Sequence, residues 1–389
     1  MRERPAGRSP AVPFLRPKPN SSPTIMHNRF TVLRPWARTA LMAIGTAVVS
    51  WAQASPAVLE QDANRLLAEH NIPSVSIAQI KDGRIVLTTA YGRSSSTAAP
   101  TPDTLYNIAS LTKPISAEVA LRLMSKGAIA LDEPMYTYWT DPDIESDERR
   151  KLLTPRISLS HQTGFANWRS ETGNVLTFRN DPGAGFGYSG EGYEYLSRFI
   201  EKKTGKNLEE HARELIFGPA GMEDTAYTRQ PWFEGRVAVP ADAQGQWLKP
   251  TFADRPVASD LAYTTAADYA RLLLQVMEDK GISADLAKER SKVQVSLREK
   301  MCQAIPKEVC PDDLGMGLGW QVLRFGSKTI LMHTGRDPGL YTYAYLCPTT
   351  GSGAVILTNG QNGNKIVLPL LKDLEAEPEF LDFLAKAMR

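Results

Sequence analysis

Ser110 and Lys113 form the only Ser-x-x-Lys pattern in the sequence, Ser110-Leu-Thr-Lys113, at the start of a helical run. Residues three apart share one face of a helix, so the Lys113 amine can reach the Ser110 hydroxyl and accept its proton. Free amide groups in the first turn of a helix favour the negative charge that develops in acyl transfer to a serine. The pattern therefore predicts a serine nucleophile with a lysine partner. Short patterns of this kind also arise by chance, so other residues have to support it.

A glycine-containing segment at 182–190 carries the next candidate, Tyr188. Its glycines allow tight turns that expose the tyrosine, which either shares the proton transfer with Lys113 or packs as an ordinary aromatic residue. The same segment contains Gly187-Tyr-Ser-Gly-Glu191. Glu191 takes the place of the final glycine in the Gly-x-Ser-x-Gly turn of α/β-hydrolases, so we do not expect that turn here.

The third candidate is the run His333-Thr334-Gly335-Arg336 at the end of a β-rich segment. A glycine at this point lets a substrate lie against the strand edge, and the Arg336 amide could complete an oxyanion hole. The alternative is that His333 is a strand-end histidine with no catalytic part.

The elements that must position these residues follow from hydrophobic periodicity. Apolar residues at helical spacing predict a first helix at 57–70, and β-rich runs around the turn dipeptide Asp82-Gly83 predict a hairpin. Further strands are expected at 318–325, 329–333, 341–347 and 354–357, and helices at 110–125, 193–203, 208–217, 266–279 and 370–388.

This order predicts a mixed α/β (α+β) fold, in which helices flank one antiparallel sheet built from both ends of the chain. The sheet should come from about residues 55–100 and 315–389, with a mainly helical region inserted at about 101–314. We expect the active site where the two regions meet, because pockets favour such junctions.

Charge is balanced overall but not along the chain. The 45 basic and 43 acidic residues give a net charge of +2, which provides no general attraction to nucleic acid. Residues 1–54, however, hold eight basic side chains and one acidic one. Arginines precede the 13-residue apolar stretch 40–52, which is too short to span a membrane, and Ala52-Gln-Ala54 resembles a cleavage site.

These features predict a disordered extension and a signal peptide over 1–54, with translation starting at Met1 or Met26. The mature chain should start near Ser55, be periplasmic or secreted, and have no stable membrane span after cleavage.

In an oxidising compartment Cys302 and Cys310 could form a disulfide, although spacing does not establish the geometry, while Cys347 lies in a strand pattern and should be buried. The five histidines are scattered without metal-ligand spacing, so we expect no metal and no other cofactor.

Taken together and in this order, the three motifs resemble the serine β-lactamase and penicillin-binding-protein superfamily, specifically its class C-like branch. Supporting stretches look like the same branch: Leu159-Ser-His-Gln-Thr-Gly164, Phe217-Gly-Pro-Ala-Gly-Met222 and Thr264-Thr-Ala-Ala-Asp-Tyr-Ala-Arg271. The resemblance covers nearly all of residues 57–389 and implies the β-lactamase/transpeptidase-like fold.

The resemblance also implies roles for the candidate residues. Ser110 would be the acylated nucleophile, and Lys113 and Tyr188 would form the proton-transfer system, although which of the two is the base stays open. His333-Thr334-Gly335 would be the substrate-facing strand, and the amides of Ser110 and Arg336 would form the oxyanion hole.

Two positions depart from the family pattern. The usual Tyr-Ser-Asn or Tyr-Ala-Asn is Tyr188-Ser-Gly190 here, so the amide that would hold an acyl-side carbonyl is absent. His333 replaces the lysine of Lys-Thr-Gly, and a histidine with an ordinary pKa is mostly neutral at pH 7. It is a weaker partner for a substrate carboxylate, and Arg336 is the alternative source of the positive charge.

These departures favour an exported serine hydrolase of esterase or D-alanyl peptidase type, acting on a small-molecule ester, an amide or a cell-wall peptide. The alternatives are a class C-like β-lactam hydrolase, and a penicillin-binding module that is acylated without turnover or is not catalytic.

Overall fold

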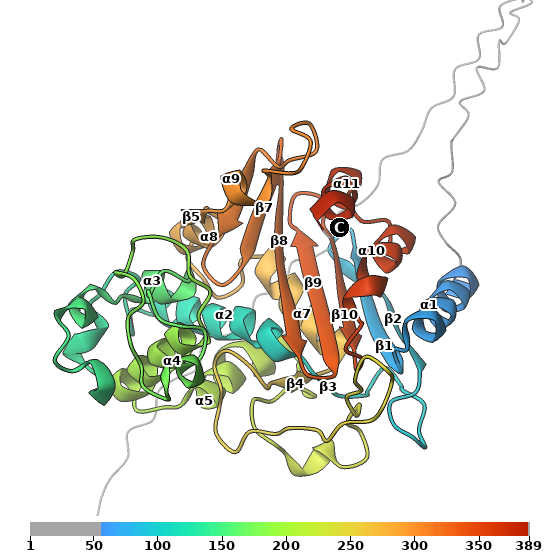
Figure 1. The fold of residues 1–389 in the computed structure, drawn as a ribbon, viewed down its shortest axis with the longest axis horizontal. Coiled ribbons are helices and arrows are strands. Elements are labelled where there is room, and N and C mark those ends of the chain that lie inside the picture. The colour runs from blue at the N-terminus through green and yellow to red at the C-terminus, as the bar shows by residue number, and fades with distance from the viewer. Residues whose placement is uncertain (1–55, 388–389) are drawn as a thin grey trace, which may run out of the picture. The chain divides into compact units, whose positions relative to one another are not determined.

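The computed structural model describes residues 56–387, which are built around one eight-stranded sheet (Figure 1). The strand order is β2-β1-β10-β9-β8-β7-β6-β5, and every neighbouring pair is antiparallel. The predicted antiparallel sheet from both ends of the chain is thereby confirmed. The predicted signal peptide, its cleavage site and both possible start codons lie outside the described residues.

The strands are β1 (Ser74–Lys81), β2 (Arg84–Gly92), β3 (Tyr106–Asn107), β4 (Tyr263–Thr264), β5 (Val295–Ser296), β6 (Asp313–Met316), β7 (Gln321–Phe325), β8 (Lys328–Asp337), β9 (Leu340–Cys347) and β10 (Ser352–Thr358). The α-helices are α1 (Pro56–His70), α2 (Thr112–Ser125), α3 (Pro155–Leu159), α4 (Gly190–Thr204), α5 (Leu208–Ala212), α6 (Gly218–Ala220), α7 (Ala266–Met277), α8 (Ala284–Arg290), α9 (Arg298–Met301), α10 (Asn364–Asp373) and α11 (Pro378–Ala387). Shorter helical turns are η1 (Ala109–Leu111), η2 (Met135–Thr137), η3 (Pro142–Ile144), η4 (Glu148–Leu152), η5 (Arg169–Thr172), η6 (Arg213–Phe217) and η7 (Pro231–Phe233).

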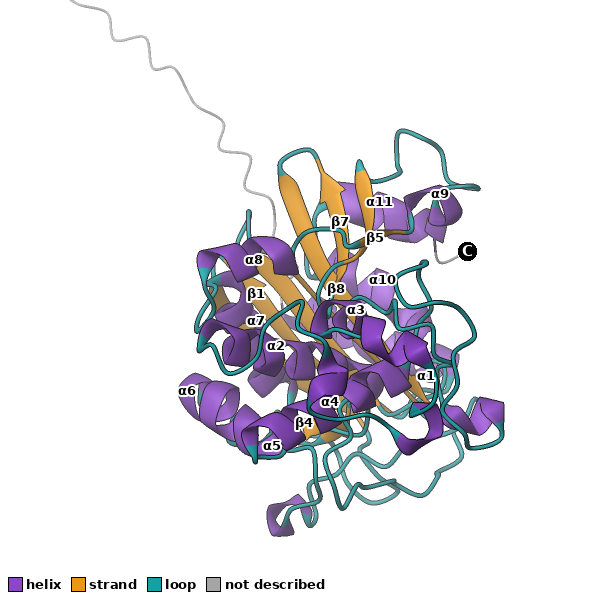
Figure 2. Ribbon diagram, turned by 90° about the vertical axis from the view of Figure 1, so that its left-hand side faces the viewer, coloured by secondary structure: helices purple, strands orange, loops and turns teal. Residues whose placement is uncertain are grey.

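The central strands are buried because helices cover both faces of the sheet (Figure 2). Successive side chains of a strand point to opposite faces. On β10, Val355 and Leu357 accordingly join the core that contains α2 and α7, whereas Ile356 joins the core that contains α1, α10 and α11. The edge strand β2 alternates between exposed and half-buried residues instead.

Two boundaries differ from the prediction. β5 and β6 extend the sheet back to residue 295, before the expected boundary near 315, because strands of two and four residues are too short to give a periodic signal. The expected single helix at 370–388 is two helices, α10 and α11. Residues 374–377 separate them, with Glu375 at a φ of 56° and Pro378 at the first position of α11.

Helix α2 places the first candidate residues. Residues 112–124 of this helix are all buried, so Lys113 on its first turn is held inside the protein. The turn η1 precedes α2 directly and contacts strands β8 and β9. The nucleophile candidate therefore lies where the helical region meets the sheet.

The cysteines are also placed. Cys302 and Cys310 form a disulfide with their Cα atoms 5.9 Å apart, which settles the alternative that spacing left open. Cys347 is buried and free, as its strand pattern predicts.

Candidate active site

Ser110 lies in the tight turn η1, whose backbone is unusual. Ala109 has a φ of 44°, a left-handed conformation that alanine rarely adopts. The Asn107 side chain accepts a hydrogen bond from the Ala109 N–H at 2.8 Å, and the Thr112 hydroxyl donates to the Ala109 carbonyl at 2.7 Å. These contacts hold the strained turn that presents Ser110 to the cavity described below.

Lys113 is placed as the sequence predicts. Its side chain is fully buried, and Nζ lies 3.0 Å from Ser110 Oγ. Nζ also donates to the backbone carbonyl of Ser259 at 2.8 Å, and the Glu194 carboxylate accepts hydrogen bonds from the Ser259 N–H and hydroxyl at 3.0 and 2.7 Å. Glu194 thereby fixes the carbonyl that orients the lysine.

Tyr188 joins the same group. Lys113 Nζ lies 4.8 Å from the centre of the Tyr188 ring. The His161 ring stacks on the Tyr188 ring, with the ring centres 4.2 Å apart. His161 is buried, and its Nδ1 accepts the Ser189 N–H at 3.1 Å. His161 therefore supports both the Tyr188 ring and the backbone that follows it.

The run from His333 to Asp337 forms one border of the cavity. On one side this run pairs with β9. On the other side β7 begins opposite Met332, so from His333 onward this edge has no β partner within residues 56–387. Gly335 packs against η1 so closely that a Cβ would lie 2.2 Å from the Ile108 carbonyl oxygen and 3.1 Å from the Ser110 nitrogen. A glycine is thus required where the strand meets the turn that carries Ser110.

His333 is buried and neutral. Burial and the nearby Lys113 lower the pKa of His333 to about 3, although its hydrogen bond with the Thr334 carbonyl opposes the shift. In that bond the His333 Nδ1 donates over 2.8 Å, which leaves Nε2 as an acceptor. Arg336, by contrast, is exposed and lines the cavity with a permanent positive charge.

Gly190 has no room for a side chain. A Cβ there would lie 2.9 Å from the Trp168 ring and 3.2 Å from the Asn167 carbonyl oxygen. Trp168 also lines the Ser110 cavity, so the same ring that fills the space beside Gly190 borders the site.

The cavity in front of Ser110 has a volume of about 440 Å³. Its lining residues are Ser110, Asn167, Trp168, Phe186, Tyr188, Asp260, Leu297, Met301, Met316, Gln321, His333, Thr334, Arg336 and Asp337. Among residues 56–387, no group of three or more His, Cys, Asp or Glu side chains is arranged to hold a metal ion.

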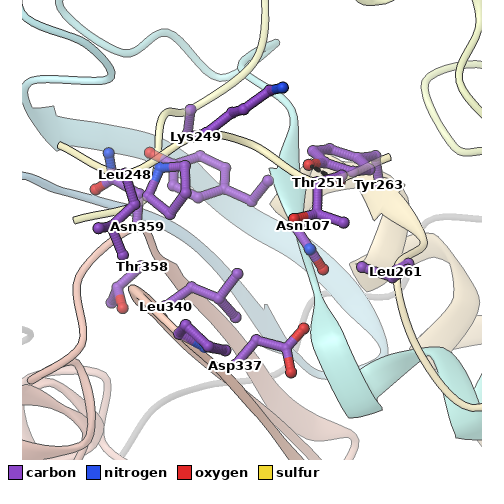
Figure 3. Close-up of a pocket in the computed structure, with 14 residues that line it drawn as sticks. Asn107, Leu248, Lys249, Thr251, Leu261, Tyr263, Asp337, Leu340, Thr358 and Asn359 are labelled. Carbon is purple, nitrogen blue, oxygen red and sulfur yellow. Dashed lines mark hydrogen bonds between the residues drawn. The ribbon is translucent and has the colours of Figure 1, made fainter. Parts of the chain in front are cut away.

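Two carboxyl groups of this cavity are not predicted from the sequence. Burial and the neighbouring Asp260 raise the pKa of Asp337 to about 7, and burial also raises the pKa of Asp260. Asp337 borders a second cavity of about 200 Å³, where its carboxyl extends toward Asn107 and Leu261 (Figure 3). Asp337 shares a strand face with His333 and Gly335, so alternation along the strand could have identified it. No comparable signal marks Asp260.

The Beta-lactamase family model matches residues 59–373. D-alanyl-D-alanine-carboxypeptidase/endopeptidase AmpH of Escherichia coli is 24% identical over 71% of this chain and 77% of its own length. Esterase EstB of Burkholderia gladioli is 31% identical, over 32% of this chain and 39% of its own length.

Solved structures show the same fold. The octameric penicillin-binding protein homologue from Pyrococcus abyssi superposes with a TM-score of 0.66 and 21% identity, covering 85% of this chain and 76% of that one. The fold and the match over most of the chain agree with the resemblance inferred from the motifs, and this chain is an enzyme that belongs to the Beta-lactamase family of serine hydrolases.

Proposed function

We propose that this chain is an exported serine hydrolase that cleaves an ester or an amide through an acyl-enzyme on Ser110. The observation that carries the proposal is the 3.0 Å contact between Lys113 Nζ and Ser110 Oγ at the wall of the cavity. A nucleophile with a proton acceptor at hydrogen-bond distance is what covalent catalysis needs.

In the proposed reaction, Ser110 Oγ attacks the substrate carbonyl carbon and its proton passes to the Lys113–Tyr188 pair. The amides of Ser110 and Arg336 stabilise the tetrahedral oxyanion. The bond to the leaving group breaks, and the leaving group takes the proton from the same pair. Water then attacks the acyl-enzyme and gives one proton to the pair, which returns a proton to Ser110 as the acid is released.

The charges in the cavity favour the esterase type and set a condition on the D-alanyl peptidase type. A neutral His333 provides no positive charge for a substrate carboxylate, so Arg336 would have to supply it if the substrate is a peptide that ends in a carboxylate. Thr334 and Gly335 would form the strand edge against which the ester, amide or cell-wall peptide substrate lies.

Export is part of the proposal and rests on the sequence of residues 1–54. Within residues 56–387, no helix is both long and apolar enough to cross a bilayer. The mass of the processed protein, recovered from a host that secretes it, tests this part directly, because cleavage after Ala54 gives one defined product.

The catalytic part is tested by intact mass and turnover. Residues 55–389 and the Ser110→Ala variant are exposed to a fluorophosphonate, a penicillin and a 4-nitrophenyl ester. One adduct on the wild type and none on the variant is the expected result, and the reagent that is turned over distinguishes esterase from β-lactam hydrolase. Stable acylation by penicillin alone would indicate an acylation-only module, and no reaction with any reagent would overturn the catalytic proposal.

A further inference from the structure

Asn167 binds the start of helix α4 through its side-chain oxygen. Oδ1 accepts the Gly190 N–H at 2.9 Å, and the Asn167 backbone carbonyl accepts the Glu191 N–H at 3.1 Å. A backbone N–H can donate only to the oxygen of a carboxamide, so this contact distinguishes Oδ1 from Nδ2 of Asn167. The NH2 group is therefore the end that points away from Gly190.

The NH2 group of Asn167 has no hydrogen-bond acceptor within residues 56–387, although the residue lines the Ser110 cavity. Asn167 also borders an adjoining cavity of about 490 Å³, which shares Phe186 and Tyr188 with the first. Two amide hydrogens thus remain available at a wall where a substrate in contact with Ser110 can extend.

Position 190 cannot provide such a donor, because the Trp168 ring and the Asn167 carbonyl occupy the space of any side chain there. We propose that Asn167 is a specificity-determining residue whose carboxamide donates to a carbonyl oxygen in the acyl part of the substrate. The enzyme would then select N-acylated aminoacyl groups over plain alkanoyl groups. This inference rests on the proposed function of Ser110.

The test compares two esters with one leaving group: N-acetylglycine 4-nitrophenyl ester, and 4-nitrophenyl pentanoate, in which two methylenes replace the amide. The measured quantity is the ratio of their kcat/KM values. Asn167→Asp keeps an oxygen for the Gly190 N–H but has no NH2 group. We expect the ratio to fall at least about tenfold in this variant, which corresponds to about 1.4 kcal/mol.

Asn180→Asp is the matched control. Asn180 borders the adjoining cavity but not the Ser110 cavity, and its side chain is exposed, so the substitution adds the same charge nearby without removing the proposed donor. We expect it to keep the wild-type ratio. Far-ultraviolet circular dichroism and the urea midpoint check that both variants are folded.

An unchanged ratio in Asn167→Asp would overturn the proposal, and so would an equal fall in Asn180→Asp, which would indicate a charge effect. The proposal would also fail if the wild-type ratio of kcat/KM values is no larger than the ratio of the rate constants for alkaline hydrolysis of the same two esters. Absence of both ester cleavage and fluorophosphonate labelling at Ser110 would instead refute the proposed function itself.

Discussion

Gly335→Ala is the substitution for which the structure gives the most direct prediction. The added Cβ would lie 2.2 Å from the Ile108 carbonyl oxygen and 2.3 Å from the Thr342 hydroxyl oxygen. Ordinary contacts begin near 3.4 Å, so strand and turn must separate by about 1.2 Å. Because the Ile108 carbonyl also accepts the Leu111 N–H at 3.0 Å, this displacement moves the turn that carries Ser110.

A displacement of about 1 Å in a reacting group costs about 100-fold in rate, and overpacking costs about 1–3 kcal/mol of stability. We therefore expect Gly335→Ala to lower both the rate of fluorophosphonate labelling and kcat/KM for 4-nitrophenyl acetate by about 100-fold, with a lower urea midpoint. Gly185→Ala is the control, because a Cβ at Gly185 meets no atom within 4 Å. Labelling of folded Gly335→Ala within about threefold of the wild-type rate would refute this reasoning.

Three further predictions concern stability in urea. Gly190→Ala should lower the free energy of unfolding by about 1–3 kcal/mol. Adding Trp168→Leu to this variant should restore only part of the loss, because the Asn167 carbonyl oxygen 3.2 Å from the new Cβ remains. His333 binds protons more readily in the unfolded chain than in the folded one, so its burial should reduce the free energy of unfolding by about 2 kcal/mol between pH 7 and 5. His333→Gln should show a smaller loss over that range, and an equal loss would contradict the buried neutral state. Cys302→Ser should cost about 2.5 kcal/mol under oxidising conditions, a difference that a reductant should abolish.

The sequence predicts the parts of the fold whose signals are local. The hairpin around Asp82-Gly83 and the helix after Ser110 both follow from periodicity and turn residues, and both are present. The residue before a proline disfavours helix, so Pro378 is a local signal for the break between α10 and α11. The amphipathic spacing across 370–388 nevertheless led to the prediction of a single helix.

The candidate site is less accessible from sequence because its remaining contacts join distant segments. His161 lies under a tyrosine that follows it by 27 residues, and nothing in the spacing of the two predicts a ring stack. Trp168 and Gly190 likewise fit together only after α4 and the preceding loop are packed. Burial determines the charge state of His333, whereas residue type alone suggests an ordinary pKa.

The pairing of β1 with β10 determines how much of the chain must be present before this enzyme can fold and become active. Val75 pairs with Thr358, so the sheet cannot close until nearly the whole chain is available for folding. Pairing over so long a separation is slow, and until it happens β1 and β9 each keep an unpaired edge that can join other chains. Nascent or truncated chains that end before residue 352 should consequently aggregate rather than retain partial activity, although Ser110, Lys113 and Tyr188 have all been translated.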